Sequence, residues 1–245
     1  MEKVNSAVRL SRVTFDNLPV LPYAVDEAVN RLSLNLGFIG NEIKRVMLIS
    51  SVPDEGKSFV STMLWRKLAE SGTKCVLMDA DLRKSVMVSK FGVHRNDNKP
   101  IMGLSSYLSG NCNITDALFS TDIRMGHIMP NSKNAPRPTL LLQNGRLEKL
   151  LDFLAEKYQR VVVDAPPIGL VSDGEVIGSL CDGFILVVRA GMTNKRMVYH
   201  SLKSLERTGC TFLGFVLNRA GSTRGTYYGG KYSKYGYGYS EYYTG

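Results

Sequence analysis

The length, composition and charge of the chain set the first limits on its structure and function. Its 245 residues, 44% of them hydrophobic, can bury one substantial core, and no uninterrupted apolar stretch approaches the roughly 20 residues of a membrane helix or forms a signal peptide. The net charge of +9 suits an anionic partner, but no block of about five basic residues concentrates it. The four scattered cysteines lack metal-site spacing, so reduced thiols are expected.

Short apolar runs rich in β-branched residues recur along the chain and predict buried strands. They are VMLIS (46–50), CVLMDAD (75–81), VVVDAPP (161–167), FILVVRA (184–190) and FLGFVLN (212–218). Helical periodicity marks segments between them, notably 57–71, 145–157 and 195–208. This alternation predicts an α/β fold with a doubly wound, mostly parallel sheet, because strands that are apolar on both faces need helices on both sides. The ligands of such a sheet bind at the carboxyl ends of its strands.

The stretch 92–144 is less regular than the rest of the chain. Loop signals occur at NDNKP and NSKNAPRP, while GLSSYLSG (103–110) predicts a short helix that ends at a glycine. No strand is predicted in this stretch.

A candidate phosphate loop, SSVPDEGKSF, follows the first core strand and leads into a helix. In this Walker A arrangement, backbone N–H groups and the helix N-terminus hold phosphates, Lys57 reaches the β and γ phosphates, and the Ser58 hydroxyl ligates Mg²⁺. The loop deviates from the usual pattern, because Ser51 replaces its first glycine and Asp54 stands where glycine would be the easier choice, although aspartate tolerates a left-handed conformation. A bare GKS is often a chance match, so the flanking strand and helix carry the prediction. The predicted nucleotide-binding residues of the loop are Ser51, Val52, Pro53, Asp54, Glu55, Gly56, Lys57, Ser58 and Phe59.

Three aspartates stand at the ends of predicted strands. Asp79 and Asp81 close the second strand, two residues apart, so both side chains leave the same face, and Asp164 closes another strand. Aspartates often end strands and begin turns, and any one of the three could do only that. Beside a phosphate loop, the three together predict carboxylates around a metal and an acceptor or base for the nucleophile, with Asp164 in the Walker B position.

The chain ends in a tyrosine- and glycine-rich tail, GTYYGGKYSKYGYGYSEYYTG. It lacks the alternation of a strand and contains too much glycine for a helix, so we expect no regular structure there. Its phenols could form a sticky low-complexity segment, a stacking platform for nucleic acid or a set of substrate hydroxyls. The candidate phosphoacceptors are Tyr227, Tyr228, Tyr232, Tyr235, Tyr237, Tyr239, Tyr242 and Tyr243. The predicted organisation is an N-terminal segment (1–25), one P-loop domain (26–220) and the tail (221–245).

Several of these motifs together resemble one protein family. SSVPDEGKS, LMDADLR, VVVDAPP, GLSSYLSG and the terminal tyrosines are similar to those of the cytoplasmic bacterial tyrosine kinases that regulate capsule and exopolysaccharide assembly. The resemblance runs from about Asp26 to the C-terminus. Its most specific part is the DxDxR motif of Asp79, Asp81 and Arg83, which separates these kinases from other P-loop proteins.

The resemblance implies a mechanism and its cofactors, ATP and Mg²⁺. Asp79 would activate the attacking tyrosine hydroxyl, while Asp81 and Asp164 would organise Mg²⁺ and its waters. Asn218 and Arg219 resemble the adenine-side segment of the family. The tail would be the kinase's own substrate, phosphorylated between neighbouring subunits, although its length also permits reaction within one chain.

The resemblance also implies partners and a location. The family works with a transmembrane adaptor that activates the kinase, here a separate protein that recruits the chain from the cytoplasm to the inner face of the membrane. A cognate tyrosine phosphatase is expected, and nucleic acid is not. Family members form a ring through a helix with the pattern E-x2-R-x2-R, and here Glu27 is in place but Asn30 and Ser33 replace the arginines. Without both guanidinium groups, we expect a weakened ring and a less stable homo-oligomer.

Two other functions compete with the kinase interpretation. A partitioning or cell-division ATPase of the MinD and ParA type shares the core fold and the deviant loop, but its signature lysine would stand where this chain has Val52. A membrane-binding ATPase of that type would also end in an amphipathic basic helix. The second competitor is a non-catalytic adaptor that binds nucleotide and uses a sticky tail. Intact Lys57, Asp79, Asp81 and Asp164 argue against an inactive site.

Overall fold

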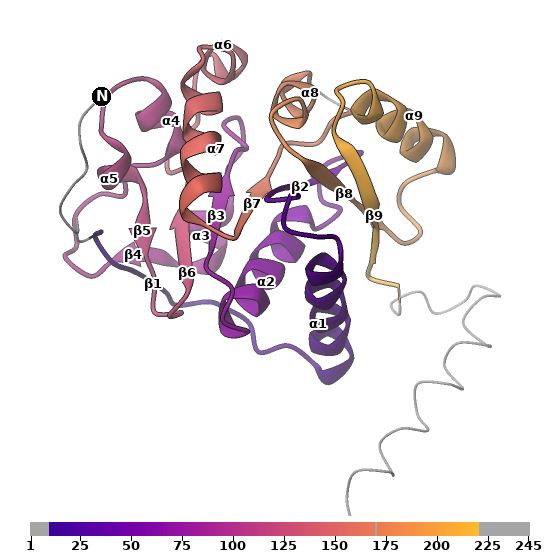
Figure 1. Ribbon diagram of the computed structural model, residues 1–245, viewed down its shortest axis with the longest axis horizontal. Coiled ribbons are helices and arrows are strands. Elements are labelled where there is room, and N and C mark those ends of the chain that lie inside the picture. Colours follow the sequence, from indigo (N-terminus) through magenta and orange to yellow (C-terminus); the bar gives the residue numbers. More distant parts are fainter. Residues whose placement is uncertain (1–9, 170, 221–245) are drawn as a thin grey trace, which may run out of the picture.

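The computed structural model describes residues 10–169 and 171–220, and a seven-stranded sheet forms the centre of this part (Figure 1). The strand order is β5-β6-β3-β7-β2-β8-β9. The strands are β2 (Arg45–Ser50), β3 (Cys75–Asp79), β5 (Phe119–Ser120), β6 (Gly126–Met129), β7 (Arg160–Asp164), β8 (Gly183–Arg189) and β9 (Thr211–Asn218). All pairings in this sheet are parallel except that of β5 with β6. The predicted α/β class and mostly parallel sheet are confirmed.

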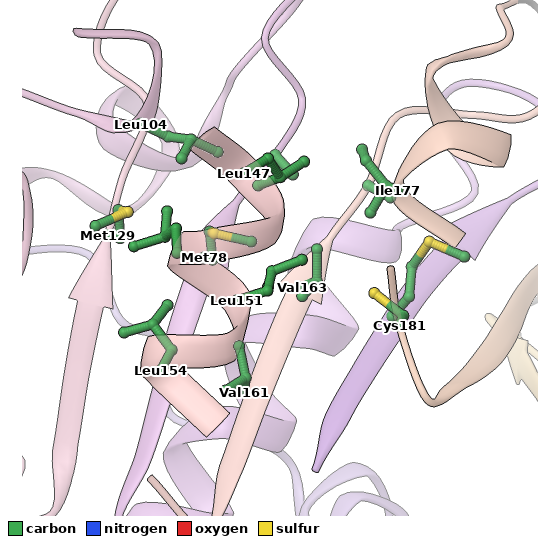
Figure 2. Packing of buried hydrophobic residues seen from close by; sticks show 14 of the residues in the cluster. Met78, Leu104, Met129, Leu147, Leu151, Leu154, Val161, Val163, Ile177 and Cys181 are labelled. Carbon is green, nitrogen blue, oxygen red and sulfur yellow. The ribbon is translucent and has the colours of Figure 1, made fainter. Parts of the chain in front are cut away.

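Helices cover both faces of the sheet (Figure 1). Helices α1 (Tyr23–Phe38) and α2 (Lys57–Glu70) pack on one face, where Val46 and Leu48 of β2 point. Helices α7 (Arg146–Lys157), α8 (Asp173–Gly178) and α9 (Lys195–Glu206) pack on the other, against Met47 and Ile49. In Figure 2, leucines of α7 lie over the apolar side chains of β3 and β7. Each central strand is therefore apolar on both faces, as the sequence predicts.

Shorter elements complete the described part of the chain. Four short helices lie between β3 and α7: α3 (Met87–Phe91), α4 (Leu104–Leu108), α5 (Ile114–Ala117) and α6 (Pro138–Leu142). Strands β1 (Val13–Phe15) and β4 (Val93–Arg95) form a separate two-stranded antiparallel sheet. No helix in 10–169 or 171–220 is long and apolar enough to cross a membrane.

The register of the parallel strands brings the predicted acidic residues together. Asp79, the last residue of β3, pairs with Asp164, the last residue of β7, and β7 also pairs with β2, which leads into the phosphate loop. The carboxyl ends of the three strands therefore meet at one edge of the sheet. The predicted tail lies outside the described residues.

Candidate active site

The phosphate loop lies between β2 and α2, and two of its residues have left-handed backbone conformations. Asp54 has φ 62° and Gly56, which precedes the first residue of α2, has φ 91°. The left-handed φ favours glycine at position 56, and a Cβ atom there would lie 2.1 Å from the side-chain nitrogen of Asn218 and displace that side chain. The expected tolerance of aspartate for this geometry holds at Asp54.

A buried glutamate connects the phosphate loop to the neighbouring strands. One Glu55 carboxylate oxygen accepts a hydrogen bond from the backbone N–H of Val52 at 3.0 Å, and the other accepts from the N–H of Arg189 at 3.2 Å and from the hydroxyl of Thr193. The Asn218 amide donates to the backbone carbonyl of Glu55 at 2.8 Å. The ends of β8 and β9 thus hold the loop in place.

A lysine and the acidic residues form a buried cluster at the start of α2. The Lys57 ammonium lies 3.3 Å from a carboxylate oxygen of Asp81 and 3.6 Å from one of Asp164. Asp79 and Asp164 are each only 1% exposed. Ser61, one turn after Lys57, donates a hydrogen bond to Asp164 at 2.9 Å. The structure therefore brings together the four charged residues that the sequence singles out at the strand ends and in the loop.

Burial and charge shift two of the pKa values in this cluster. Burial lowers the pKa of Lys57, but Asp164, Asp81 and Asp79 raise it more, so the ammonium is held charged. Burial and the nearby Asp164 carboxylate raise the pKa of Asp79 to about 7, against the opposing effects of the Ser85 hydroxyl and of Lys57. A carboxyl group with this pKa is partly protonated near neutral pH.

Three polar residues around the cluster were not predicted. The Ser85 hydroxyl lies 2.5 Å from a carboxylate oxygen of Asp79 and 2.7 Å from the backbone carbonyl of Asn131, which follows β6. Ser85 stands six residues after Asp79 in an irregular loop, and no sequence period marks it. Ser61 had a detectable signal, because it lies four residues after Lys57 and so shares its helix face.

Arg83, the arginine of the DxDxR motif, connects its loop to helices α6 and α8. Arg83 donates through Nε and Nη2 to the two carboxylate oxygens of Asp173, at 2.6 and 3.1 Å, and Asp173 is 1% exposed at the start of α8. The Thr139 hydroxyl of α6 donates to the same carboxylate at 2.6 Å. This bidentate pair fixes the loop that carries Asp81 against α6 and α8.

A cavity of about 540 Å³ opens above the phosphate loop. Seven residues of the predicted site line it: Pro53, Asp54, Gly56, Lys57, Ser58, Asp81 and Arg219. Eight further residues line it that the sequence did not single out as binding nucleotide: Arg83, Lys84, Val86, Lys90, Pro166, Pro167, Val171 and Arg189. Ser51, Val52, Glu55, Phe59, Asp79, Asp164 and Asn218 do not line it. The cavity thus lies among the phosphate loop, the segments after β3 and β7, and the ends of β8 and β9.

The predicted ligands fit a hydrated magnesium ion: Ser58 and Asp81 line the cavity, and Asp164 lies next to it, 3.6 Å from the Lys57 ammonium. Within 10–169 and 171–220, no three His, Cys, Asp or Glu side chains are grouped so that they could hold a metal ion alone. Mg²⁺ usually takes one or two carboxylates and completes its shell with phosphate oxygens and water. The Ser58 hydroxyl and the carboxylates of Asp81 and Asp164 therefore remain the predicted protein ligands.

No protein-family profile matches the chain, but curated relatives do. The tyrosine-protein kinase CpsD of Streptococcus agalactiae is 38% identical over 211 residues, which cover 86% of this chain and 90% of the relative. CpsD of Streptococcus pneumoniae is 35% identical over 79% of this chain and 84% of its own length. The tyrosine-protein kinase etk of Escherichia coli is 32% identical over 89% of this chain, which corresponds to 30% of etk.

Solved structures show the same relationship. The kinase domain of Escherichia coli ETK superposes with a TM-score of 0.72 at 30% identity, covering 82% of this chain and 79% of that domain. The VpsO kinase domain gives a TM-score of 0.71 at 30% identity, covering 80% and 96%. The septum site-determining protein MinD of Pyrococcus horikoshii shares the fold. It superposes with a TM-score of 0.64 at 23% identity, covering 74% of this chain and 72% of that protein. On identity and coverage, the chain belongs to the bacterial tyrosine-protein kinases.

Proposed function

We propose that the chain transfers the γ-phosphoryl group of Mg-ATP to tyrosines of its own C-terminal tail. The observation that carries this proposal is the buried cluster of Lys57, Asp79, Asp81 and Asp164 beside a cavity that opens over the N-terminus of α2. This arrangement provides groups for phosphate, for a metal and for a proton at a single site. Tyrosine-protein kinase is also the name of the curated relatives.

In this proposal the phosphate loop and Lys57 bind the polyphosphate. The first two residues of α2, Lys57 and Ser58, line the cavity, and the unpaired N–H groups and dipole of a helix N-terminus favour negative charge there. The adenine base of the nucleotide would lie toward Asn218 and Arg219, at the end of β9. Arg219 lines the cavity itself, while Asn218 acts on the loop through Glu55.

Mg²⁺ would be held by Ser58, Asp81 and Asp164. When bound, it neutralises charge on the β and γ phosphates. The contacts from Lys57 and Ser61 hold the carboxylate of Asp164 in a fixed orientation before nucleotide arrives. Preformed ligands of this kind lower the cost of ordering the site.

Asp79 is the proposed acceptor of the tyrosine proton. A phenol has a pKa of about 10 and is a poor nucleophile while protonated, so a carboxylate that accepts its proton promotes transfer. The pKa of Asp79, raised to about 7 by burial and by Asp164, suits this role at neutral pH. The N–H of Asp81, at 3.2 Å, and the Ser85 hydroxyl orient its two oxygens.

The biological setting is part of the same proposal. We infer that the modified tail regulates capsular or exopolysaccharide assembly, that a separate transmembrane adaptor activates the kinase at the membrane, and that a cognate phosphatase reverses the reaction. The support is the family resemblance and the relatives named CpsD.

Incubation of the purified chain with Mg-ATP, followed by mass spectrometry of its tail peptides, tests the proposal. Phosphotyrosine is expected among residues 227–243 of the wild type and of Lys149→Met, whose lysine is exposed on α7, and none in Lys57→Met. Release of free phosphate without phosphotyrosine would instead indicate an ATPase of the MinD type. Nucleotide binding without either reaction would indicate a non-catalytic adaptor.

A further inference from the structure

Lys90 lies at the phosphate cavity and has no role in the mechanism above. Lys90 is on α3, which follows the loop that carries Asp79 and Asp81, and it lines the same cavity as Lys57 and Ser58. Its ammonium lies 5.8 Å from the ring centroid of Phe59, the third residue of α2, and 5.5 Å from that of Phe91. The ring of Phe59 therefore places this solvent-accessible cation beside the first turn of α2.

The charges around Lys90 differ from those of an ordinary surface lysine. Partial burial lowers its pKa, and the charges that act on it come from the site itself, with Asp164 and Asp54 raising the pKa and Arg219 and Lys57 lowering it. Among the residues that the structure describes, no carboxylate lies within ion-pair distance of its ammonium. Lys90 thus brings a positive charge to the cavity that no described acidic residue neutralises by direct contact.

Lys57, the lysine of the phosphate loop, is already engaged. Lys57 contacts Asp81 and Asp164, and the buried cluster holds three carboxylates against one ammonium. This leaves an excess of negative charge even when Asp79 is protonated. A polyphosphate that enters the cavity brings several more negative charges, and phosphoryl transfer depends mainly on positioning and electrostatic stabilisation.

Arg83 and Lys84, on the loop before α3, line the same cavity but are placed differently. Arg83 donates to both carboxylate oxygens of Asp173, and Lys84 is an exposed residue whose backbone N–H donates to Asp81 at 3.0 Å. Of these three cations, Lys90 is the one whose ammonium lies over the aromatic ring of Phe59, two residues after Lys57 at the start of α2.

We propose that Lys90 is a second phosphate-binding lysine, supplied by the same chain, whose ammonium contacts the polyphosphate of the bound nucleotide. The inference rests on the proposed function, because it assumes that the cavity takes a nucleoside triphosphate. It adds a specific contact from α3, an element outside the phosphate loop. Occupation of the cavity would then draw α3 and its loop toward the N-terminus of α2.

Titration of Mg-ATP into the full chain tests the inference without depending on catalysis. Lys90→Gln is expected to weaken Mg-ATP binding about ten- to hundredfold, the range for a hydrogen bond to a charged group. Lys90→Arg keeps the positive charge and is expected to retain most of the affinity. Lys149→Gln removes the same charge from the exposed face of α7 and should bind as the wild type does. Unfolding temperatures without nucleotide check that all four proteins are folded.

The outcomes separate this inference from the proposed function. Wild-type affinity in Lys90→Gln, or an equal loss in Lys90→Gln and Lys90→Arg, would overturn the role of the Lys90 charge while leaving the kinase proposal intact. The four proteins could bind Mg-ATP with the expected order of affinities while the wild type forms no phosphotyrosine. That result would support the phosphate-binding role of Lys90 and contradict autophosphorylation. A wild type that does not bind Mg-ATP would contradict both.

Discussion

At the scale of single residues, Glu55 shows how the phosphate loop is held. This carboxylate is fully buried, and the donors it faces are neutral groups: two backbone N–H groups, of Val52 and Arg189, and the Thr193 hydroxyl. These donors come from the loop itself and from the end of β8 and the segment after it. Glu55 therefore positions the backbone that is proposed to bind phosphate, without itself lining the cavity.

Glu55→Gln is expected to weaken nucleotide binding more than it slows the bound enzyme. The amide replaces one acceptor oxygen by a donor, so one buried N–H group loses its partner, at a cost of about 1–3 kcal/mol. The expected result is a lower unfolding temperature and a raised KM for ATP, with kcat nearly unchanged. Glu148→Gln, at an exposed position of α7, is the matched control. A fall in kcat without a change in KM would contradict the positioning role.

Asp79→Asn is expected to reduce phosphoryl transfer far more than nucleotide affinity. An amide cannot accept the phenol proton. Its single carbonyl oxygen can still accept the hydrogen bond from the N–H of Asp81, while its NH2 group would face Ser85, whose hydroxyl can turn to accept. In the wild type, kcat/KM, whose pH dependence reports groups of the free enzyme, should fall as the pH drops below about 7, where Asp79 becomes protonated. This dependence should disappear from the residual activity of the variant. Equal losses in affinity and rate would reassign Asp79 to metal binding or fold support.

The same carboxylate makes the nucleotide-free protein less stable at high pH. Its pKa is about 7 in the folded protein and about 3.9 in the unfolded chain, so stability falls as the pH rises from about 4 to about 7 and then levels off. Asp79→Asn should therefore raise the unfolding temperature at pH 8, by the equivalent of about 1–3 kcal/mol. The gain should shrink toward pH 5.

Unfolding scans of wild type and variant between pH 5 and pH 9 measure this effect. Glu156→Gln removes an exposed carboxylate from α7 and should change little at any pH. A variant that is less stable than the wild type at pH 8 would show that the contacts of Asp79 outweigh its desolvation.

At the scale of secondary-structure elements, the packing of α1 limits how the two arginines of the family's E-x2-R-x2-R pattern could be restored. Asn30 is half-buried, Ser33 is 8% exposed and packed toward the core, and Arg31 pairs with Glu27 at 3.2 Å. An arginine at position 33 would bury a guanidinium without a described partner, whereas one at position 30 has access to solvent. The two positions are therefore not equivalent.

Ser33→Arg is expected to lower the unfolding temperature by about 6–12 °C, corresponding to about 3 kcal/mol in a domain of this size. Asn30→Arg should stay within about 2 °C of the wild type. Differential scanning calorimetry of both variants measures the difference. Equal stability would mean that α1 can turn to expose position 33, and would make the family pattern compatible with this chain.

The central strands could be predicted because both of their faces are buried. Val161, Val162 and Val163 of β7 are all 0% exposed, so a continuous apolar run reveals the strand. Strand β6 was not predicted, because it has only four residues and includes Gly126 and the half-buried His127. Its place depends on tertiary packing: a Cβ atom on Gly126 would lie 2.6 Å from the ring of Trp65.

The residues of the candidate site could be predicted from the sequence where the strand or helix that carries them could be predicted. Lys57 and the three aspartates follow recognisable strands or begin a recognisable helix, so the topology alone brings them together. Asn131 follows β6, and because that strand was missed, its contact with Ser85 was missed too. Lys90 lies on a five-residue helix with no periodicity that could identify its position.

At the scale of the whole molecule, charge connects the site to the tail. The chain carries a net charge of +9, and its tail contributes Arg224, Lys231 and Lys234 against one acidic residue, Glu241. The site holds three clustered carboxylates and would bind an anionic nucleotide. On charge alone, we expect an unmodified tail to be attracted to a neighbour's site or to an anionic bilayer.

Phosphorylation is expected to reverse this attraction and separate the subunits. Each phosphotyrosine adds about −1.5 to −2 charges at neutral pH, so eight modified tyrosines would add about −12 to −16 and make the chain acidic. Repulsion from a neighbour's carboxylates and nucleotide would then oppose further docking, so the reaction limits itself. Light scattering of both forms at low and physiological salt should give a larger mass for the unmodified chain, with a difference that shrinks as salt screens it. Equal masses at both salt concentrations, with unchanged binding to anionic vesicles, would mean that the tail records kinase activity without controlling assembly.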